Sequence, residues 1–203
     1  DRLEVRLQVG RRLQAQAGGP VGVVGRGDER GHRHLRGRAR PRGVGDVHGV
    51  HAGVDRGEQG AELAFSYVGE RFKERITEFA AEFGSNLVFE CDVSSDEQIS
   101  KMFADLEKVW PKFDGFVHAI GFAPREAIAG TFLDGLSREN FRTAMDISAY
   151  SFPGMAKAAL PYLNNHSALL TLTYLGAIRT VPHYNTMGVA KAALETSVKY
   201  LAN

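Results

Sequence analysis

The chain has little that would cross-link it or hold it in a membrane. Its single cysteine, Cys91, cannot form a disulfide within the chain. No apolar run reaches the roughly 18 to 20 residues of a membrane span, and no signal-peptide pattern opens the sequence. These absences predict a cytoplasmic protein. Cys91 lies within the apolar run LVFECDV, so we expect a buried thiol without catalytic chemistry.

The first part of the chain lacks half of the amino-acid types. Up to Ala64 there is no Ser, Thr, Asn, Lys, Ile, Met, Phe, Tyr, Trp or Cys. Residues 1–58 hold 12 Arg against 4 Asp and 3 Glu, a net charge of +5, whereas the remainder carries −4. Each residue type present can be encoded by a codon beginning with G or C, as a shifted reading of a GC-rich gene would produce. We therefore predict that residues 1–58 are frameshifted or otherwise non-native, or disordered.

Two binding functions compete for this segment. RGRARPRG, residues 36–43, is basic enough for an arm that neutralises nucleic-acid phosphates, but it lacks interleaved aromatic residues for base stacking. PVGVVGRG, residues 20–27, offers glycines for a phosphate loop. With 13 glycines among 58 residues, such a match is expected by chance, and a poor helix former follows it. We assign no binding site to either stretch.

From residue 59 onward, strand and helix patterns alternate. Period-two or continuous apolar runs predict strands at residues 61–67, 87–93, 113–120 and 167–173. Helical periodicity predicts helices at residues 70–83, after Ser94 or Ser95, at 138–163 and at 186–199. Repeated strand and helix units indicate an α/β fold with a doubly wound parallel sheet, which is Rossmann-like.

Three residues near the C-terminus form the leading candidate site. Tyr174 ends the apolar run SALLTLT, and Tyr184 precedes Lys191 by seven residues in YNTMGVAK. Residues seven apart lie two turns along one face of a helix, so a phenol and an ammonium there can address one ligand. Ligands of open α/β sheets bind beyond the carboxyl ends of the strands, where Tyr174 is expected.

Two further strand ends carry features of a cofactor site. CDV places Asp92 where a strand stops, and HAIGFA places Gly121 where a ligand could approach the backbone closely. Each has a plainer interpretation, since Asp92 could begin a turn and Gly121 could end a strand. His118 is interpreted as a partly buried, hydrogen-bonded histidine. No second ligand accompanies it at metal-site spacing, so no metal is expected.

The longer motifs resemble one family. The matching text is GAELAFSYVGERFKERITEFAAEFGS, CDV, WPKFDGFVHAIGFAPREAIAG, DISAYSF, LLTLTYLGA and YNTMGVAKAALE. From about residue 60 to residue 203 the chain resembles the NADH-dependent enoyl-[acyl-carrier-protein] reductases of bacterial fatty-acid synthesis, a divergent branch of the short-chain dehydrogenase/reductase superfamily. Ordinary members of the superfamily separate the catalytic Tyr and Lys by three residues. Here Gly188 occupies that Lys position, and Lys191 gives the six-residue gap of the enoyl reductases.

The resemblance implies catalytic roles. Tyr184 would hydrogen-bond the thioester carbonyl of a trans-2-enoyl chain carried by acyl carrier protein while NADH delivers a hydride. Lys191 would hold the nicotinamide ribose, and its charge would favour the reactive arrangement of Tyr184. Tyr174 would be the second active-site phenol. The resemblance also implies a homotetramer.

It implies binding positions as well. Asp92 and Val93 would contact the adenine end of NADH, and Ile120 and Gly121 would contact the cofactor after the next strand. The residues expected to line the acyl pocket are Phe122, Ala123, Tyr174, Tyr184 and Met187. Residues 59–203 would then form a partial NAD(P)-binding domain.

The chain departs from the family at both ends. Nothing in residues 1–58 reproduces the family's first strand, its glycine-containing turn or the Ser-Ile-Ala segment that receives the pyrophosphate. That strand is central in the superfamily, so the strands at 61 and 113 would lack a shared neighbour unless another segment fills the gap. The printed sequence ends before the family's last two strands and substrate-covering loop. We expect poor NADH binding; the alternative is an inactive fragment that keeps only the oligomerisation surfaces.

Overall fold

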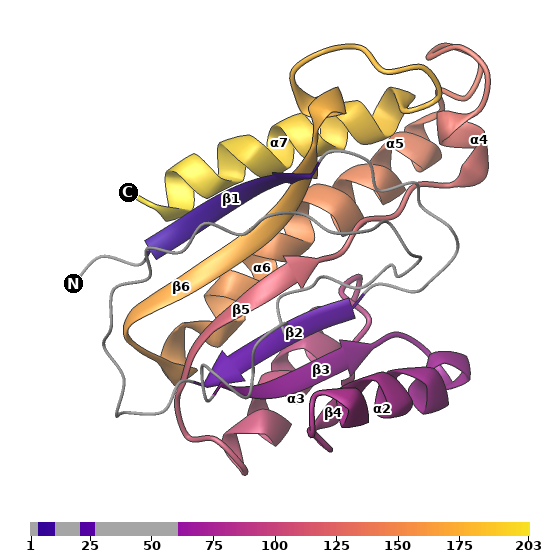
Figure 1. Ribbon diagram of the computed structural model, residues 1–203. Coiled ribbons are helices and arrows are strands. Elements are labelled where there is room, and N and C mark those ends of the chain that lie inside the picture. Colours follow the sequence, from indigo (N-terminus) through magenta and orange to yellow (C-terminus); the bar gives the residue numbers. More distant parts are fainter. Residues whose placement is uncertain (1–3, 11–20, 27–60) are drawn as a thin grey trace, which may run out of the picture.

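The computed structural model describes residues 4–10, 21–26 and 61–203, and Figure 1 shows their arrangement. The basic stretch at residues 36–43 lies outside the described residues. Six strands form one sheet in the order β1-β6-β5-β2-β3-β4. They are β1 (Glu4–Gly10), β2 (Val21–Arg26), β3 (Glu62–Tyr67), β4 (Val88–Glu90), β5 (Phe113–Ala119) and β6 (Leu163–Tyr174).

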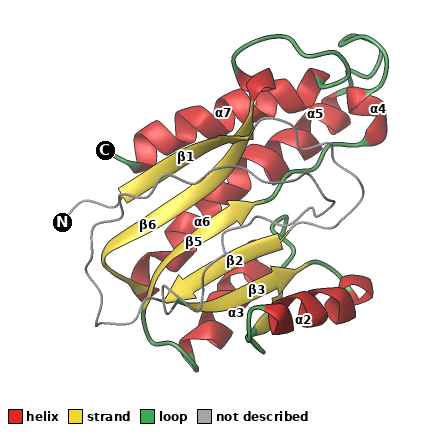
Figure 2. Cartoon of the chain, viewed as in Figure 1, coloured by secondary structure: helices red, strands yellow, loops and turns green. Residues whose placement is uncertain are grey.

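Helices follow most strands, as Figure 2 shows. The α-helices are α2 (Lys73–Glu82), α3 (Asp96–Glu107), α4 (Arg125–Ile128), α5 (Arg138–Met145), α6 (Ser151–Ala159) and α7 (Asn185–Leu201). Shorter turns of helix are η2 (Glu70–Phe72), the π-helical η3 (Asp146–Tyr150), η4 (Leu160–Tyr162) and η5 (Leu175–Ala177). Alternating strands and helices confirm the predicted α/β, Rossmann-like class from residue 61 onward.

Strand β2 fills the gap predicted between β3 and β5, but it runs the other way. It pairs antiparallel with both neighbours, Val23 lying opposite Phe65 and Val117. The pairs β1–β6, β5–β6 and β3–β4 are parallel. Strands β3 and β5 therefore point the same way, and the carboxyl ends of all the strands except β2 share one edge of the sheet. The prediction of a parallel sheet is wrong at β2 alone.

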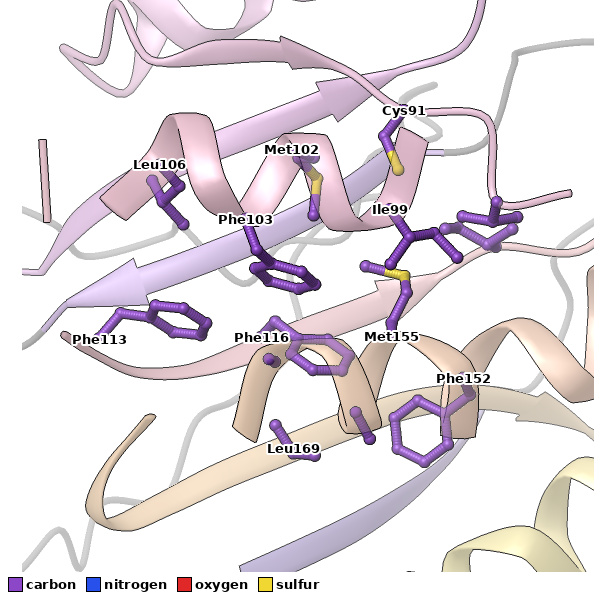
Figure 3. Packing of buried hydrophobic residues seen from close by; sticks show 14 of the residues in the cluster. Cys91, Ile99, Met102, Phe103, Leu106, Phe113, Phe116, Phe152, Met155 and Leu169 are labelled. Carbon is purple, nitrogen blue, oxygen red and sulfur yellow. The ribbon is translucent and has the colours of Figure 1, made fainter. Parts of the chain in front are cut away.

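The core lies on both faces of the sheet. On one face α3, α6 and α7 pack against β5 and β6 around Phe103, Phe113, Phe152 and Leu169, each almost fully buried (Figure 3). On the other face α2 packs on β3. There the rings of Phe65 and Phe79 meet edge to face, with their centroids 5.6 Å apart. Burial of these side chains removes large apolar surfaces from water and stabilises the layered fold.

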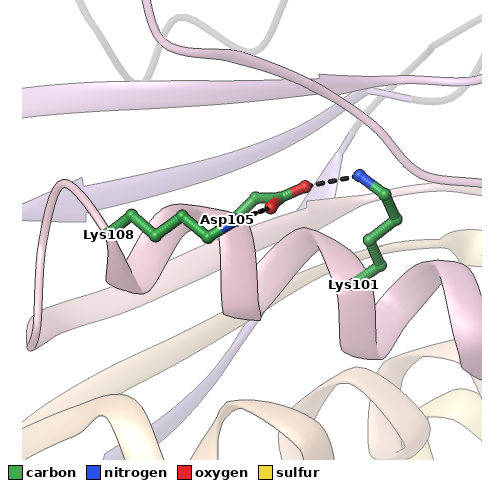
Figure 4. A network of polar contacts seen from close by, with 3 residues as sticks. All are labelled: Lys101, Asp105 and Lys108. Carbon is green, nitrogen blue, oxygen red and sulfur yellow. Dashed lines mark hydrogen bonds and ion pairs between the residues drawn. The ribbon is translucent and has the colours of Figure 1, made fainter.

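Helix α3 shows how local sequence sets an element. Ser95 caps its first turn, accepting a hydrogen bond from the Gln98 amide at 3.2 Å, as predicted. On the exposed face Asp105 pairs with Lys101 and Lys108 (Figure 4). Hydrogen bonds from the two ammonium groups lower the pKa of Asp105 to about 2.

The element boundaries differ from the predictions in three places. Strand β4 spans only Val88–Glu90, whereas the apolar run predicted a strand at residues 87–93. It lies at the edge of the sheet and pairs with β3. The helix expected at 138–163 is interrupted by η3 and ends at Ala159. Pro161 follows, and a proline cannot donate the backbone bond that would continue the helix. Strand β6 then begins at Leu163, four residues earlier than predicted.

Candidate active site

The site is built at the carboxyl ends of β5 and β6. These neighbours are parallel and in register, with His118 opposite Thr171, so the backbone carbonyls of Ile120 and Leu172 lie at the same edge. Tyr174 is the last residue of β6. Helix α7 follows β6 in the chain and packs next to it (Figure 1). The helix also contacts η5 and η3.

Lys191 joins the two strand ends. Its side chain is 7% exposed, and its Nζ donates to the carbonyl oxygens of Ile120 at 3.3 Å and of Leu172 at 3.0 Å. An ammonium has three N–H donors, so one is left for a ligand. Burial lowers the pKa of Lys191 to about 8. Helix α7 thus brings Lys191 to the predicted edge of the sheet.

Gly121 leaves the backbone open beside this ammonium. A Cβ atom at Gly121 would lie 3.3 Å from Nζ of Lys191 and 3.8 Å from Oγ of Ser148. Ser148 holds the next residue of the loop, because its hydroxyl donates to the Phe122 carbonyl and accepts from the Phe122 amide, both at 2.8 Å. Gly121 is exposed; the approach of a ligand to its backbone stays a prediction.

Tyr174 and Tyr184 form a ring pair. Their centroids lie 4.8 Å apart and the ring planes are tilted by 57°. Burial, followed by the neighbouring Tyr174, raises the pKa of the Tyr184 phenol, which therefore stays protonated at neutral pH and can donate a hydrogen bond.

Tyr184 lies at the start of the helix that carries Lys191. It is the N-cap of α7 and has right-handed helical dihedral angles; that it shares one helix face with Lys191 stays a prediction. The residues on either side, His183 and Asn185, have positive φ angles of 58° and 39°. Asn185 is held in place by Nδ2, which donates to the carbonyls of Ala129 at 3.4 Å and Gly130 at 3.3 Å.

His118 lies directly beneath the site. It is fully buried, and its ring nitrogens contact Oγ1 of Thr171 at 3.0 Å and Oγ of Ser151 at 2.8 Å. Burial and then the charge of Lys191 lower the pKa of His118 to about 3. The predicted hydrogen-bonded histidine is thus more deeply buried than expected, and it is neutral in the folded protein.

The other predicted binding residues are spread along the same edge. Asp92 follows β4, the outermost strand, and its carboxylate accepts bonds from the amide and hydroxyl of Ser94 at 2.9 and 2.7 Å. The carboxylate therefore organises a turn, which was the plainer interpretation. Val93 is buried in the core. Their contacts with an adenine remain predictions.

The residues expected to line the acyl pocket surround the tyrosines in part. Phe122 is 49% exposed next to Gly121, while Ala123 and Met187 are half-buried. The Met187 amide donates to the Tyr184 carbonyl at 2.9 Å. Their role in binding an acyl chain remains a prediction.

Several site residues had no sequence signal. Ser148 sits on the π-helical turn η3, a feature that no periodicity reveals. Thr186, in the first turn of α7, is fully buried, and its Oγ1 has no hydrogen-bond partner among the residues that the structure describes. Gly176 and Gly188 lie against Tyr184 and against each other. Only the small residues in LGA and MGV hint at such close packing.

The segment tested as a phosphate loop is a strand. Gly22 and Gly25 lie within β2, paired to β3 and β5. Because β2 is antiparallel, its carboxyl end faces away from the site edge. A turn that follows a parallel central strand, in contrast, leaves from the site edge.

Other chemistry finds no support among the described residues. No group of three or more His, Cys, Asp or Glu side chains there could hold a metal ion. Cys91 is buried, and burial raises its pKa to about 12, so the thiol is unreactive as predicted. Within the same part of the chain, no helix has the length and apolar character to cross a membrane.

The fold and site together define a Rossmann-like α/β domain with a tyrosine pair and a buried lysine at the carboxyl edge of its sheet. Sequence comparison then decides the family. The sequence model of the family described as enoyl-(acyl carrier protein) reductase matches residues 49–203. The match begins before residue 60, where the resemblance was expected to start. The chain belongs to the enoyl-(acyl carrier protein) reductase family.

Individual relatives agree. The NADH enoyl-[acyl-carrier-protein] reductase of Escherichia coli (strain K12) is 57% identical over 145 residues, which are 71% of this chain and 55% of that protein. The enzyme of Aquifex aeolicus is 44% identical over 168 residues, 81% of this chain and 62% of its own length. The chain thus spans little more than half the length of the curated relatives it matches.

Solved structures give the same result. The crystal structure of the Aquifex aeolicus reductase superposes with a TM-score of 0.66 at 47% identity, covering 68% of this chain and 55% of that one. The enoyl reductase of Anaplasma phagocytophilum, solved in complex with NAD, gives a TM-score of 0.65 at 46% identity, covering 68% and 52%.

Proposed function

We propose that this protein is an NADH-dependent enoyl reductase that saturates the trans-2 double bond of enoyl thioesters on acyl carrier protein in fatty-acid elongation. The supporting observation is the convergence of Tyr174, Tyr184 and Lys191 at the carboxyl ends of β5 and β6, in a member of this family. A cytoplasmic location is part of the proposal.

The chain's own groups then have defined tasks. Protonated Tyr184 donates a hydrogen bond to the thioester carbonyl and stabilises the enolate as its charge develops. Tyr174, 4.8 Å from it between ring centroids, packs against the same end of the substrate. The third N–H of Lys191 binds the ribose hydroxyls. Bound NADH would supply the hydride for the β carbon, and a proton from solvent added at the α carbon would complete the saturation.

The described residues fit one end of the cofactor. Gly121 has no side chain beside the Lys191 ammonium: an ideal Cβ there would lie 3.3 Å from Nζ. This open space next to an N–H donor suits a nicotinamide ribose. At the phosphate end, antiparallel β2 replaces the strand that would lead into a pyrophosphate-binding turn. We therefore expect NADH to bind more weakly than micromolar; a micromolar dissociation constant by titration calorimetry would contradict this.

Reduction of a crotonyl thioester at millimolar NADH tests the function. We expect turnover, measured as loss of NADH absorbance, and a decrease of about 100-fold in Tyr184→Phe because one donor to the developing enolate is lost. Tyr200→Phe is the matched control, since that ring is 82% exposed at the far end of α7. No turnover in the unmodified chain, or equal turnover in Tyr184→Phe, would contradict the proposal.

A second candidate is an inactive fragment that keeps the family's oligomerisation surfaces. The observation behind it is that large apolar side chains are exposed along η3, η4 and α7, including Tyr150 at 49%, Leu160 at 58% and Tyr200 at 82%. Both candidates include a homotetramer, which light scattering would detect. A tetramer without turnover supports the fragment.

A further inference from the structure

The ring of Tyr184 lies against backbone at two glycines. An ideal Cβ at Gly176 would overlap Cδ1 of Tyr184 and lie 2.8 Å from Cε1. An ideal Cβ at Gly188 would lie 2.8 Å from the Gly176 carbonyl oxygen and 3.7 Å from Cδ1 of Tyr184. Neither glycine has a positive φ, so space rather than backbone conformation requires glycine at both positions.

The backbone that carries the ring is strained. His183 and Asn185 flank Tyr184 with φ angles of 58° and 39°, which side chains other than glycine rarely adopt. Such a conformation persists only where the surroundings hold it. The side-chain amide of Asn185 donates to the carbonyls of Ala129 and Gly130. The Tyr184 ring packs against Tyr174, Gly176 and Gly188.

We propose that Gly176 and Gly188 form a seat that positions the Tyr184 ring beside Tyr174. Gly188 allows the carbonyl of Gly176, in η5, to approach α7 closely, and Gly176 then leaves the space that the Tyr184 ring occupies. The glycine seat is a feature of the fold; its consequence for catalysis rests on the proposed reductase function.

The seat also gives a reason for the spacing between Tyr184 and Lys191. Position 188 comes four residues after Tyr184, where a side chain would run into the Gly176 carbonyl. An ammonium that serves the same site must therefore come from a later position on α7. Lys191 supplies it and reaches the carbonyls of Ile120 and Leu172.

NMR of the full chain with ¹³C-labelled tyrosine rings tests the seat directly. The chain has six tyrosines, and Tyr174→Phe and Tyr184→Phe assign the two signals of interest. We expect Gly176→Ala and Gly188→Ala each to shift the Tyr174 and Tyr184 signals and to leave the others in place. Unchanged Tyr174 and Tyr184 signals in the folded variants would overturn the proposal.

The matched control is Gly154→Ala on α6. The three atoms nearest its new Cβ all belong to the Tyr150 ring, the first at 3.3 Å. That ring is about half exposed, and its hydroxyl donates to a carboxylate oxygen of Asp96 at 3.5 Å. We expect a shift of the Tyr150 signal and none of Tyr174 or Tyr184.

A double-mutant cycle covers the case in which Gly176→Ala folds poorly. The urea midpoint should fall when Gly176→Ala is made in the unmodified chain and stay unchanged when it is made in Tyr184→Ala, because the ring is then gone. Equal losses in both backgrounds would contradict the seat.

Steady-state kinetics add a functional readout. Gly176→Ala should lower kcat about tenfold with little change in KM for the thioester, since the variant misplaces the donor without removing a binding group. If the unmodified chain shows no turnover, the proposed function fails, while the ring signals and the cycle still decide whether the seat exists.

Discussion

At the scale of single residues, burial decides which groups carry charge. Lys191 keeps an ammonium whose pKa is lowered to about 8, and His118 beneath it is neutral with a pKa of about 3. Burial is the first cause of both shifts. Sequence motifs located these residues, but their burial depends on β5, β6, α6 and α7 packing together.

Lys191 makes the stability of the protein depend on alkaline pH. Its pKa is about 8 in the folded protein and has an ordinary value of 10.5, so between these values the unfolded chain binds more protons. The free energy of unfolding should therefore rise with pH in this window, by at most about 3 kcal/mol. Below pH 8 the full cost of burying the ammonium is present.

Urea unfolding from pH 7.5 to 10 measures this effect. The unfolding free energy of the unmodified chain minus that of Lys191→Met should increase as pH rises above 8, because only the unmodified chain carries the buried ammonium. Lys157→Met, at an exposed position on α6, should keep the slope of the unmodified chain. Parallel pH profiles for the unmodified chain and Lys191→Met would show that Lys191 is not the cause.

At the scale of elements, apolar periodicity was sufficient to place β3, α2, α3, β5 and α7 within a few residues. It failed where an element depends on its neighbours. The π-helical turn η3 interrupts the helix between Arg138 and Ala159, and it brings Ser148 to the Phe122 backbone. Sequence periodicity does not register one extra residue in a helical turn.

Helix α7 begins with a buried hydroxyl. Thr186 is fully buried, and within residues 4–10, 21–26 and 61–203 its hydroxyl meets no hydrogen-bond partner. An unsatisfied buried hydroxyl costs about 1 to 3 kcal/mol. Thr186→Val keeps the shape and removes the hydroxyl, so we expect the free energy of unfolding to increase by about 1 kcal/mol in urea titrations.

Thr77→Val is the control for this change. Thr77 is exposed on α2, and its hydroxyl donates to the Lys73 carbonyl at 2.8 Å. No gain in stability is expected there. A loss of stability in Thr186→Val would mean that the hydroxyl is satisfied in solution.

At the scale of the whole molecule, the central position of the sheet is the unusual feature. Strand β2 comes from the segment of restricted composition and lies antiparallel between β3 and β5. It satisfies the backbone edges of its neighbours, and its carboxyl end lies at the edge of the sheet opposite the site. We propose that the part of residues 1–58 that precedes the family match at residue 49 is not the segment that evolved with the rest of the domain.

The encoding DNA tests this proposal. Translation of the other two frames upstream of Glu58 should reveal a strand, a glycine-containing turn and a Ser-Ile-Ala segment. A chain carrying that segment should bind NADH at micromolar concentration, whereas the present chain should not, as titration calorimetry would show. If neither frame contains the segment, the frameshift hypothesis is wrong.

The α/β class, most elements after residue 61 and the family are readable from the amino-acid order, because they follow from periodicity and from motifs that are contiguous in the chain. The assembly of the site is visible only in the folded molecule. The burial of Lys191, the seat of Tyr184 on Gly176 and Gly188, and the direction of β2 all depend on contacts between segments distant in sequence. Such contacts form only when the layers pack, so no local pattern encodes them.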